Sequence, residues 1–315
     1  MNSGSIEYSV GAPGRDSHGK ITDFVFRVNP SPEHGSSFCY GRRDDIFGEI
    51  SSCKQLVTAR RGDELIGVVF GYTDKNKHNT DVNLMIAPEL CDDDYNALAR
   101  GLFAKYRAAL GKDMKYTFFF SSHNTRCARF LCDIGANREV NEYGLILRRG
   151  CERNLSESNT DVKSGGDFGV ISELCAGNEH DCRAFAALHD EIFPDVYISG
   201  DDIINDLSRG ADGKHAVLTC RCGDSIIAYC VLFYKSAGRF TAEIVGVRPE
   251  FRHMGYGKRV LSYCIRHAFY DGSENADIID MIVDSDNENA LGLYFSLGFE
   301  IEFENNCFTI AKDSE

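Results

Sequence analysis

The feature that most constrains the fold is a succession of secondary structure that the sequence predicts twice, once in each half. Each copy contains a hairpin, a strand that ends at proline, a helix, a strand, a helix that ends at glycine, and a closing strand. In the first half these elements are expected at residues 55–60 and 64–72, 81–87, 91–110, 116–120, 124–134 and 139–148; in the second half they are expected at 216–222 and 225–234, 240–247, 256–270, 278–284, 287–297 and 299–310. One order repeated over about 100 residues predicts two copies of one α/β domain.

The segments that precede each copy are expected to differ. In the first half, residues 21–28 predict a strand after an irregular glycine-containing segment, and residues 43–50 carry a weak helical signal. In the second half, residues 168–174 predict a strand, followed by helices at 180–193 and 201–209. The polar stretch between the halves predicts a linker at 151–167, and hence domains at 1–150 and 168–315.

Charge is distributed unevenly between these halves. Residues 1–150 hold 20 Lys and Arg against 19 Asp and Glu, whereas residues 151–315 hold 14 against 29, and the whole chain has a net charge of −14. Such an acidic half argues against non-specific nucleic-acid binding, which needs a cationic surface. It would favour a cationic or amine-bearing substrate, although a solubilising surface explains it equally well.

The composition predicts a protein of the cytoplasm. No apolar run approaches the roughly 18 residues of a membrane span, and the first residues lack the basic and apolar regions of a secretory signal, so we expect no membrane association. The thirteen cysteines are odd in number and include no Cys-x-x-Cys pair. Reduced structural thiols are therefore expected, rather than a metal site.

Residues 247–258 predict a turn that can hold a phosphate group. They follow a strand and open a helix, whose first N–H groups point outward without partners in a field that favours negative charge. Gly255 and Gly257 allow backbone to approach closely, and Arg252 and Lys258 add positive charge. The stretch is neither a dinucleotide fingerprint, whose third glycine is replaced by Val260, nor a Walker loop.

Two motifs in the second half resemble those of the GCN5-related N-acetyltransferases, the GNAT superfamily. The first is Val-x-Pro-x-x-Arg-x-x-Gly-x-Gly at residues 247–257, and the second is Asn-x-x-Ala-x-x-Leu-Tyr-x-x-Leu-Gly-Phe at residues 287–299. The resemblance covers residues 168–310 and implies two tandem domains, each a mixed, mostly antiparallel twisted sheet flanked by helices. It also implies transfer of an acyl group, most simply acetyl from acetyl-CoA, to a primary amine by direct attack in a ternary complex, without a metal.

The resemblance implies roles for particular residues. Backbone groups of the strand would bind the pantetheine arm, the loop would surround the pyrophosphate, and a helix asparagine would contact the cofactor; these residues are Val245, Gly246 and Val247, then Arg252, His253, Met254, Gly255, Tyr256, Gly257 and Lys258, and lastly Asn287. Gly246 could alternatively mark a bulge, and Asn287 is also an ordinary helix cap.

Two residues are candidates for catalysis. Tyr294 would donate to the sulfur of the leaving thiolate, with a packed core tyrosine as the alternative. Glu243 would be the general base; it lies four residues before Val247 and so is expected on the same strand face, with a charged surface position as the alternative. A second position used for the base in the family holds Ile282 here.

The first copy departs from the family pattern at the cofactor site. Residues 88–94 contain no glycine pair and include Asp92, Asp93 and Asp94, whose charge would repel a pyrophosphate. Leu131 stands where the second copy has Tyr294. We therefore expect a degenerate first domain without an acyl-CoA phosphate loop.

The loop at residues 193–202 is expected to lie near the acceptor. Asp195, Asp201 and Asp202 could meet a cation there, although Asp201 and Asp202 also suit the first turn of a helix. His189, among apolar helix positions, is expected to be structural. A small-molecule amine is the expected substrate. The protein is expected to be either a monomer, in which the two domains form an internal pseudo-dimer, or a homodimer. The alternatives are a protein N-terminus or lysine as acceptor, or a regulatory protein that binds acyl-CoA without turnover.

Overall fold

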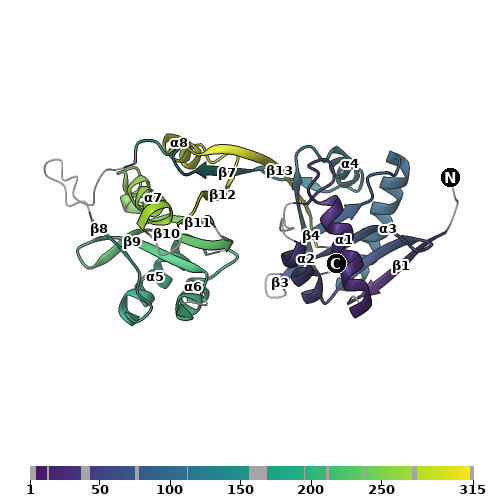
Figure 1. The fold of residues 1–315 in the computed structure, drawn as a ribbon, viewed down its shortest axis with the longest axis horizontal. Helices are drawn as coiled ribbons and strands as arrows, with labels where there is room; N and C mark the ends of the chain where they lie inside the picture. Colours follow the sequence, from purple (N-terminus) through teal and green to yellow (C-terminus); the bar gives the residue numbers. More distant parts are fainter. Residues whose placement is uncertain are drawn as a thin grey trace. The chain divides into compact units, whose positions relative to one another are not determined.

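The structure is a computed structural model that describes residues 5–12, 14–36, 43–74, 78–111, 113–155, 169–194, 196–210, 213–236, 238–271 and 275–312. The chain forms two compact units (Figure 1). The first comprises Met1–Glu142 with Phe303–Glu315, and the second comprises Tyr143–Glu302. Each unit is a mixed sheet with helices on both faces, as the sequence predicts.

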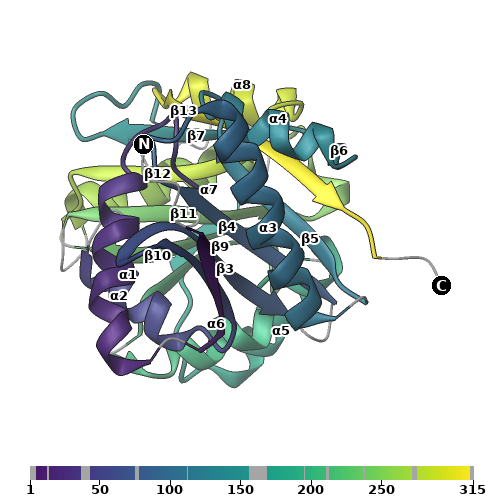
Figure 2. The ribbon, with the colours of Figure 1, turned by 90° about the vertical axis from the view of Figure 1, so that its right-hand side faces the viewer.

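The first unit is built on a sheet of order β1-β2-β3-β4-β5-β13, in which β4 and β5 are parallel and the other neighbours antiparallel. Figure 2 shows α1 and α2 on one side of these strands and α3 on the other. The elements are β1 (Ile6–Gly11), α1 (Arg15–Val28), α2 (Arg43–Ser52), β2 (Leu56–Arg61), β3 (Glu64–Asp74), β4 (Asn79–Ile86), α3 (Asp92–Leu110), β5 (Lys115–Ser121), α4 (Thr125–Asp133) and β6 (Asn137–Arg138).

The expected strand at residues 21–28 is wrong, because these residues form the second half of helix α1. Ile21, Phe24, Val25 and Val28 are all buried, and their spacing of three, one and three residues places them on one helical face. The β-branched and aromatic composition had suggested a strand, and packing of this face overrides that preference. The segment expected to be irregular contributes the edge strand β1.

The second unit has the strand order β13-β7-β12-β11-β10-β9-β8. Figure 1 shows α7 on one face of this sheet and α5 and α6 on the other, and we call these the α7 face and the α5/α6 face. The elements are β7 (Glu142–Arg148), β8 (Val170–Glu173), α5 (Glu179–Ile192), α6 (Gly200–Leu207), β9 (His215–Cys222), β10 (Ser225–Ser236), β11 (Arg239–Val247), η2 (Pro249–Phe251), α7 (Tyr256–Arg266), the π-helical turn η3 (His267–Asp271), β12 (Ile278–Asp284), α8 (Glu288–Ser296) and β13 (Glu300–Ile310).

The two units exchange their closing strands. β7 follows the first copy in sequence but lies between β12 and β13, and its Leu145 and Leu147 are buried in the core of the second unit. The far end of β13 pairs with β5, and its Phe308 is buried in the core of the first unit. The compact units therefore differ from the predicted domains 1–150 and 168–315, because an alternating pattern predicts a strand but not its neighbour in the sheet. Residues 156–167 of the predicted linker lie outside the described residues.

Within the described residues, no helix has both the length and the apolar character needed to cross a membrane. The twelve cysteines in this part of the chain are not joined in disulfides, and Cys39 lies outside it. Six of them are buried among apolar side chains, which agrees with a structural use of the thiols.

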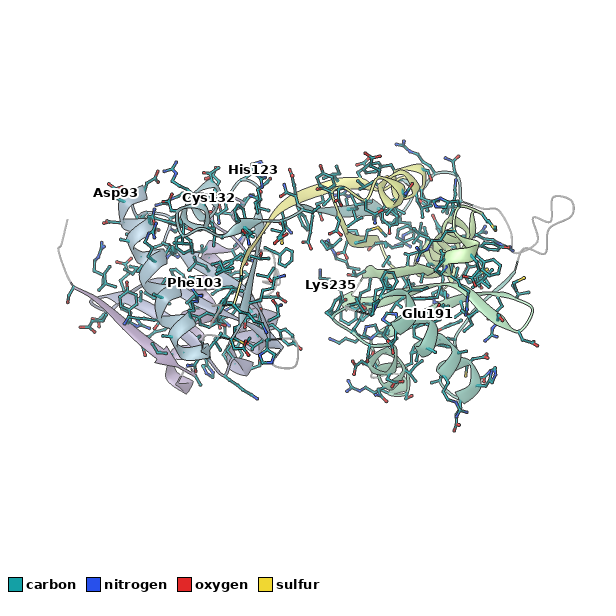
Figure 3. The ribbon with its side chains drawn as sticks, turned by 180° about the vertical axis from the view of Figure 1, so that it is seen from behind. Asp93, Phe103, His123, Cys132, Glu191 and Lys235 are labelled. Carbon is teal, nitrogen blue, oxygen red and sulfur yellow. The ribbon has the colours of Figure 1, made fainter. Side chains whose placement is uncertain are left out.

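The parallel ladder between β11 and β12 is short. It joins Arg239, Phe240 and Thr241 to Ile278, Ile279 and Asp280, and both strands then run on, over residues 242–247 and 281–284. We call the place where this ladder ends the β11–β12 fork. The carboxylate of Asp280, which is nearly buried, accepts hydrogen bonds from Arg239 Nε and Thr241 Oγ1, each at 2.5 Å. Lys235, at the end of β10 (Figure 3), lies 3.7 Å from the same carboxylate.

Because Asp280 ties the two strands together at the fork, Asp280→Ala should destabilise the second unit by about 1–3 kcal/mol, since it leaves Arg239 and Thr241 without their acceptor. Urea unfolding measures the effect. Glu179→Ala, which removes an exposed ion pair with Arg183, is the matched control and should stay within about 0.5 kcal/mol of wild type. Equal midpoints for the two variants would contradict the assigned role.

Candidate active site

Beyond the fork, β11 presents one edge that is not bonded to β12. Val245, Gly246 and Val247 lie on this part of the strand, and their other edge pairs with β10. Gly246 is opposite Tyr229, and a Cβ placed on it would lie 2.4 Å from Cε1 of that ring. The glycine is therefore required by the Tyr229 ring, and the alternative that it marks a bulge is wrong.

The bulge in β11 lies at Glu243 instead. Ala242 pairs with Leu232 and Ile244 pairs with Val231, so Glu243 is the extra residue on its strand. Val245 and Val247 pack against the core of the α7 face, whereas the partners of Glu243 belong to β9 and the loop before α6. The expectation that Glu243 and Val247 share a strand face is thus wrong, because it assumes an unbroken alternation.

Each carboxylate oxygen of Glu243 has a hydrogen-bonding partner. The hydroxyl of Tyr197, in the loop between α5 and α6, donates to Oε1, and Nε2 of His215 lies 3.0 Å from Oε2. The Glu243 side chain keeps 15% of its accessible surface and that of His215 keeps 8%. Sequence reasoning missed both partners, because the pairing of β9 with β10 and the closure of the loop bring them to Glu243, and neither is visible as a local pattern.

The N-terminus of α7 is open. Gly255, its capping position, has a left-handed backbone (φ 87°), and no described side chain caps the helix. The helices α5, α6 and α8 are instead capped by Asn178, Ser199 and Asn287. The first N–H groups of an α-helix make no bond within the helix, so the backbone donors at this end of α7 can bind an anion.

The loop before α7 is exposed and partly braced by its own backbone. Arg252 Nε donates to the carbonyl of Val247 at 3.1 Å, which holds the loop over the end of β11. His253, like Gly255, has a positive φ, at 60°. Met254 is exposed, while Tyr256 is half-buried with its ring edge-on to Phe251. The loop thus presents Arg252 and backbone groups to solvent beside the open helix end.

Three elements converge at Gly257. A Cβ on this glycine would lie 3.3 Å from Val247 Cγ2 and 3.7 Å from Leu293 Cδ2, so the start of α7, the end of β11 and helix α8 are close together. Tyr294, the residue after Leu293, is half-buried and packs on the core of the α7 face. Burial, with a smaller contribution from nearby Cys230, raises the pKa of Tyr294 to about 12. Its phenol therefore stays protonated and can donate a hydrogen bond at neutral pH.

The remaining described polar candidates cap helices or lie in their first turns. Asn287 caps α8 by accepting from the N–H of Ala290 at 3.2 Å. Asp202 forms a capping box with Ser199, whose hydroxyl donates to it at 2.7 Å, so the helix-cap alternative for Asp202 is supported. Asp201 lies in the same first turn, and Asp195 lies outside the described residues.

His189 is fully buried and fixes the loop between α5 and α6. Its Nδ1 lies 3.0 Å from the Tyr229 hydroxyl, and its Nε2 lies 2.9 Å from the carbonyl oxygen of Ile198. Ile198 follows Tyr197 in this loop. The expected structural role of His189 agrees with these contacts.

The first unit has a corresponding fork, and its own chain fills it. The parallel ladder of β4 and β5 ends at Val82 and Phe118. One residue further along each strand, the hydroxyl of Ser36 lies 2.7 Å from Asn83 Oδ1 and 3.2 Å from the carbonyl oxygen of Phe119. Asn124, which caps α4 as Asn287 caps α8, also donates to the carbonyl of Gly35 at 3.3 Å. Residues 35 and 36 therefore lie where the second unit has the β11–β12 fork.

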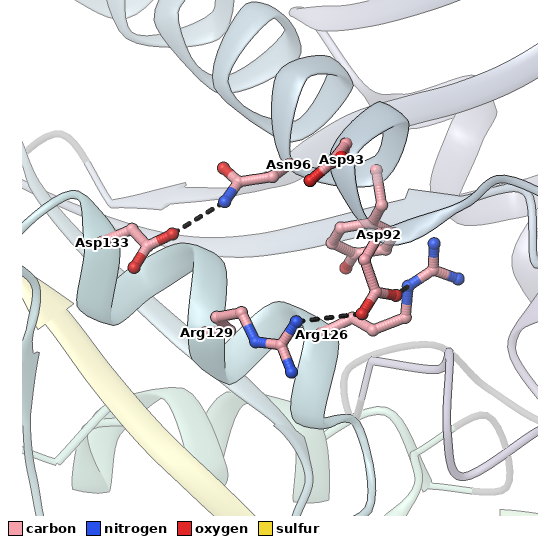
Figure 4. Close-up of a pocket in the computed structure, with 7 residues that line it drawn as sticks. Asp92, Asp93, Asn96, Arg126, Arg129 and Asp133 are labelled. Atoms are coloured by element: carbon pink, nitrogen blue, oxygen red, sulfur yellow. Dashed lines mark hydrogen bonds and ion pairs between the residues drawn. The ribbon is translucent and has the colours of Figure 1, made fainter.

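The N-terminus of α3 carries carboxylates instead of an open turn (Figure 4). Asp92 forms ion pairs with Arg126, at 3.3 Å, and Arg129, at 2.9 Å. Arg126 also donates to the carbonyl oxygens of Leu90 and Cys91, at 2.6 and 3.0 Å. A cavity of about 240 Å³ is lined by Asp92, Arg126 and Arg129, together with Asp93, Tyr95, Asn96 and Asp133. The cations near this helix end are therefore already paired within the protein.

Comparison with known protein families finds a match within the second half. Residues 182–299 match the Acetyltransferase (GNAT) family. No curated protein sequence matches the chain.

Solved structures resemble the whole chain. A GCN5-related N-acetyltransferase from Sphaerobacter thermophilus has a TM-score of 0.73 at 12% identity, over 96% of this chain and 95% of that one. A tandem GNAT protein from the clavulanic acid biosynthesis pathway, solved without AcCoA, has a TM-score of 0.68 at 14% identity, over 99% and 100%. A glucosamine N-acetyltransferase region of a fungal multi-domain GH3 beta-N-acetylglucosaminidase has a TM-score of 0.69 at 13% identity, over 98% of this chain and 38% of that one. These likenesses show a shared fold, including a tandem form.

The close fit of Gly246 against Tyr229 predicts strong coupling between the two positions. Gly246→Ala should destabilise the protein by about 1–3 kcal/mol in the wild-type background, because the added Cβ overlaps the ring. In a Tyr229→Leu background the same substitution should cost much less, as a double-mutant cycle by thermal unfolding would measure. Gly292→Ala, at an open helix position, is the control. Additive effects at positions 246 and 229 would contradict the assigned contact.

Proposed function

We propose that the chain, through the region at residues 182–299 that matches the Acetyltransferase (GNAT) family, transfers the acetyl group of acetyl-CoA to the primary amine of a small molecule. One observation carries the proposal: in the matched region, an unpaired edge of β11 leads directly into an uncapped helix N-terminus. A strand edge offers hydrogen bonds to an extended amide-containing chain, and the helix end offers them to phosphates. Pantetheine followed by pyrophosphate has this sequence of groups.

The residues present fit the coenzyme. The edge of β11 at Val245, Gly246 and Val247 would bind pantetheine, and residues 252–258, with the N–H groups of α7, would bind the pyrophosphate. Asn287 caps α8 with its Oδ1, which leaves its amide N–H groups for the coenzyme. Acetyl-CoA supplies an acyl group that is activated as a thioester. Among the described residues, no group of three or more His, Cys, Asp or Glu side chains is arranged to hold a metal ion, and the expectation that the reaction needs none stays a prediction.

Two residues on opposite faces of the sheet are assigned the proton transfers. Glu243, on the α5/α6 face, would accept a proton from the substrate ammonium, which frees the nitrogen lone pair to bond to the acyl carbon. Tyr294, on the α7 face, would donate its proton or a hydrogen bond to sulfur as the carbon–sulfur bond breaks. N–H groups on the edge of β11 are the donors available to the acyl oxygen as it gains negative charge. The amine thus becomes an amide and the coenzyme leaves as a thiol.

The chemistry around Glu243 supports a cationic acceptor. Glu243 and Asp206 are acidic, and residues 151–315 carry 29 acidic against 14 basic side chains, which would attract an ammonium group. We propose a small amine for this reason and expect no nucleic-acid partner. The cytoplasmic location, and a monomeric or homodimeric state, stay predictions.

We further propose that each chain binds one acetyl-CoA, in the second unit. In the first unit Ser36 occupies the β4–β5 fork, and Asp92 places negative charge at the helix end where a pyrophosphate would lie. These contacts support a degenerate first copy that serves the protein as a folded partner.

Acetyl-CoA should bind the wild-type chain with a stoichiometry of one in isothermal titration calorimetry. Gly255→Val and Gly257→Val should each weaken this binding by at least about tenfold. Valine at position 255 is strained by the left-handed backbone of the turn, and valine at position 257 would crowd Val247 and Leu293. Gly62→Val also places a side chain at a positive φ, in the β2–β3 turn of the first unit, and should bind normally. A stoichiometry of two, or normal binding by both loop variants, would overturn the assignment.

Tyr294→Phe should lower kcat for amine-dependent thiol release from acetyl-CoA by at least about tenfold, because the proton donor is lost while the ring remains. A panel of small amines, polyamines and peptides with free N-termini or lysines would serve as acceptors in a thiol-release assay. Tyr263→Phe, a half-buried tyrosine on α7, is the control and should keep wild-type kcat. Tight acetyl-CoA binding without turnover on the whole panel would favour a regulatory acyl-CoA-binding protein instead.

A further inference from the structure

Four side chains from separate parts of the second unit form one hydrogen-bonded chain. Tyr197, in the loop before α6, donates to Glu243 Oε1, and Glu243 Oε2 lies 3.0 Å from His215 Nε2. His215 is the first residue of β9, and its Nδ1 lies 2.6 Å from Oδ2 of Asp206 on α6. The same Asp206 oxygen accepts from the backbone N–H groups of Lys214, at 2.7 Å, and His215, at 3.0 Å. The imidazole is therefore held between two carboxylates.

This arrangement needs one proton more than a neutral imidazole can supply. A neutral ring has one N–H donor, whereas here each nitrogen faces a carboxylate oxygen. Without the second proton, the Nε2 lone pair and the Glu243 carboxylate face each other as two acceptors at 3.0 Å. The geometry therefore favours the form of His215 that carries a proton on each ring nitrogen.

The surroundings agree with this conclusion. Burial by itself would lower the pKa of His215, but the hydrogen bonds and charges of Glu243 and Asp206 raise it above the ordinary value. For Asp206, burial acts to raise the pKa, and the hydrogen bonds from His215 and the backbone outweigh it, so the pKa is lowered. Asp206 thus stays an anion.

Two further charged groups, Arg209 and Lys214, lie near the Asp206 end of this hydrogen-bonded series of side chains. Arg209 lies 3.4 Å from Asp206 Oδ1, and Lys214 extends over the Phe233 ring, with Nζ 5.8 Å from its centre. Phe233 covers His215 on the β10 side, with the ring centres 5.0 Å apart. The two carboxylates therefore remain the closest charges to the imidazole.

We propose that His215 and Asp206 are positioning residues for the acyl transfer that act through Glu243 by taking up, as a unit, the proton that Glu243 removes from the amine. The inference rests on the proposed function. In the active form His215 is neutral, with its proton on Nδ1 toward Asp206. The N–H bond of the substrate ammonium breaks, its proton passes to Glu243 and then to His215 Nε2, and the lone pair stays on the amine nitrogen. The imidazolium later returns the proton to solvent, so nothing is oxidised or reduced.

The proposal predicts the pH dependence of the reaction. Because the active form has an unprotonated Nε2 and the pKa of His215 is raised, kcat/KM for the amine should increase with pH along a limb centred above pH 6.5. Asp206→Asn removes one of the two stabilising anions while keeping an oxygen that can accept hydrogen bonds. It should therefore move the limb to lower pH by about one unit. His215→Gln should remove the limb and lower kcat, with the KM for acetyl-CoA little changed.

NMR titration of the imidazole tests the shared proton without any turnover. The His215 signal, assigned by its absence in His215→Gln, should titrate above pH 6.5 in the wild type and about one unit lower in Asp206→Asn. Asp181→Asn is the control; this carboxylate pairs with Arg221 elsewhere in the unit and should move neither the signal nor the pH–rate limb. The proposal is supported when the signal and the limb shift together in Asp206→Asn.

Three outcomes would overturn it. A His215 signal that titrates near pH 6.5 and does not move in Asp206→Asn would show that no proton is shared. A shifted signal with an unchanged limb would show that His215 only supports the structure around Glu243. Absence of turnover with every amine would remove the proposed function and with it the role of the relay, while the shift of the NMR signal would still report the shared proton separately.

Discussion

The second unit depends on the contact that ends the β11–β12 ladder. Asp280 accepts from Arg239 and Thr241, which are both on β11, so one buried carboxylate fixes the last paired positions of two parallel strands. Past this point β11 has one edge bonded to β10 and another edge open to a ligand. The loop that precedes α7 begins where this open edge ends. Strand, loop and helix N-terminus form one continuous set of backbone donors and acceptors.

The two copies show how one topology can leave a fork between parallel strands open or fill it with its own chain. Both contain a fork between parallel strands and an asparagine that caps the following helix. In the first unit Ser36 bridges the diverging strands, and Asn124 bonds to the carbonyl of Gly35. In that unit the polar groups at the fork already make hydrogen bonds within the protein. A ligand that replaced these bonds with its own would therefore gain little binding energy. The sheet is thereby stabilised without a ligand.

Local patterns allowed much of this fold to be predicted, because hairpins, helices and glycine stops depend on nearby residues. The loop at residues 247–258 and Tyr294 were predicted as site residues from two motifs, each of which is a short run of sequence. The helical form of residues 21–28 was not predictable from composition, since it depends on a face buried against the sheet. The exchange of β7 and the end of β13 is likewise a choice of strand neighbours, which alternation does not encode.

The surroundings of Glu243 illustrate the limit most clearly. An unbroken strand would direct this side chain to the α7 face, beside Val245 and Val247, where a carboxylate would be buried among apolar groups. The bulge inserts one residue and turns Glu243 to the α5/α6 face, where Tyr197 and His215 supply donors to both oxygens. A single extra residue therefore decides whether the carboxylate is an uncompensated buried charge or one end of a proton-sharing chain. Because a bulge is defined by the register of the neighbouring strand, it becomes visible once β10 and β11 are paired.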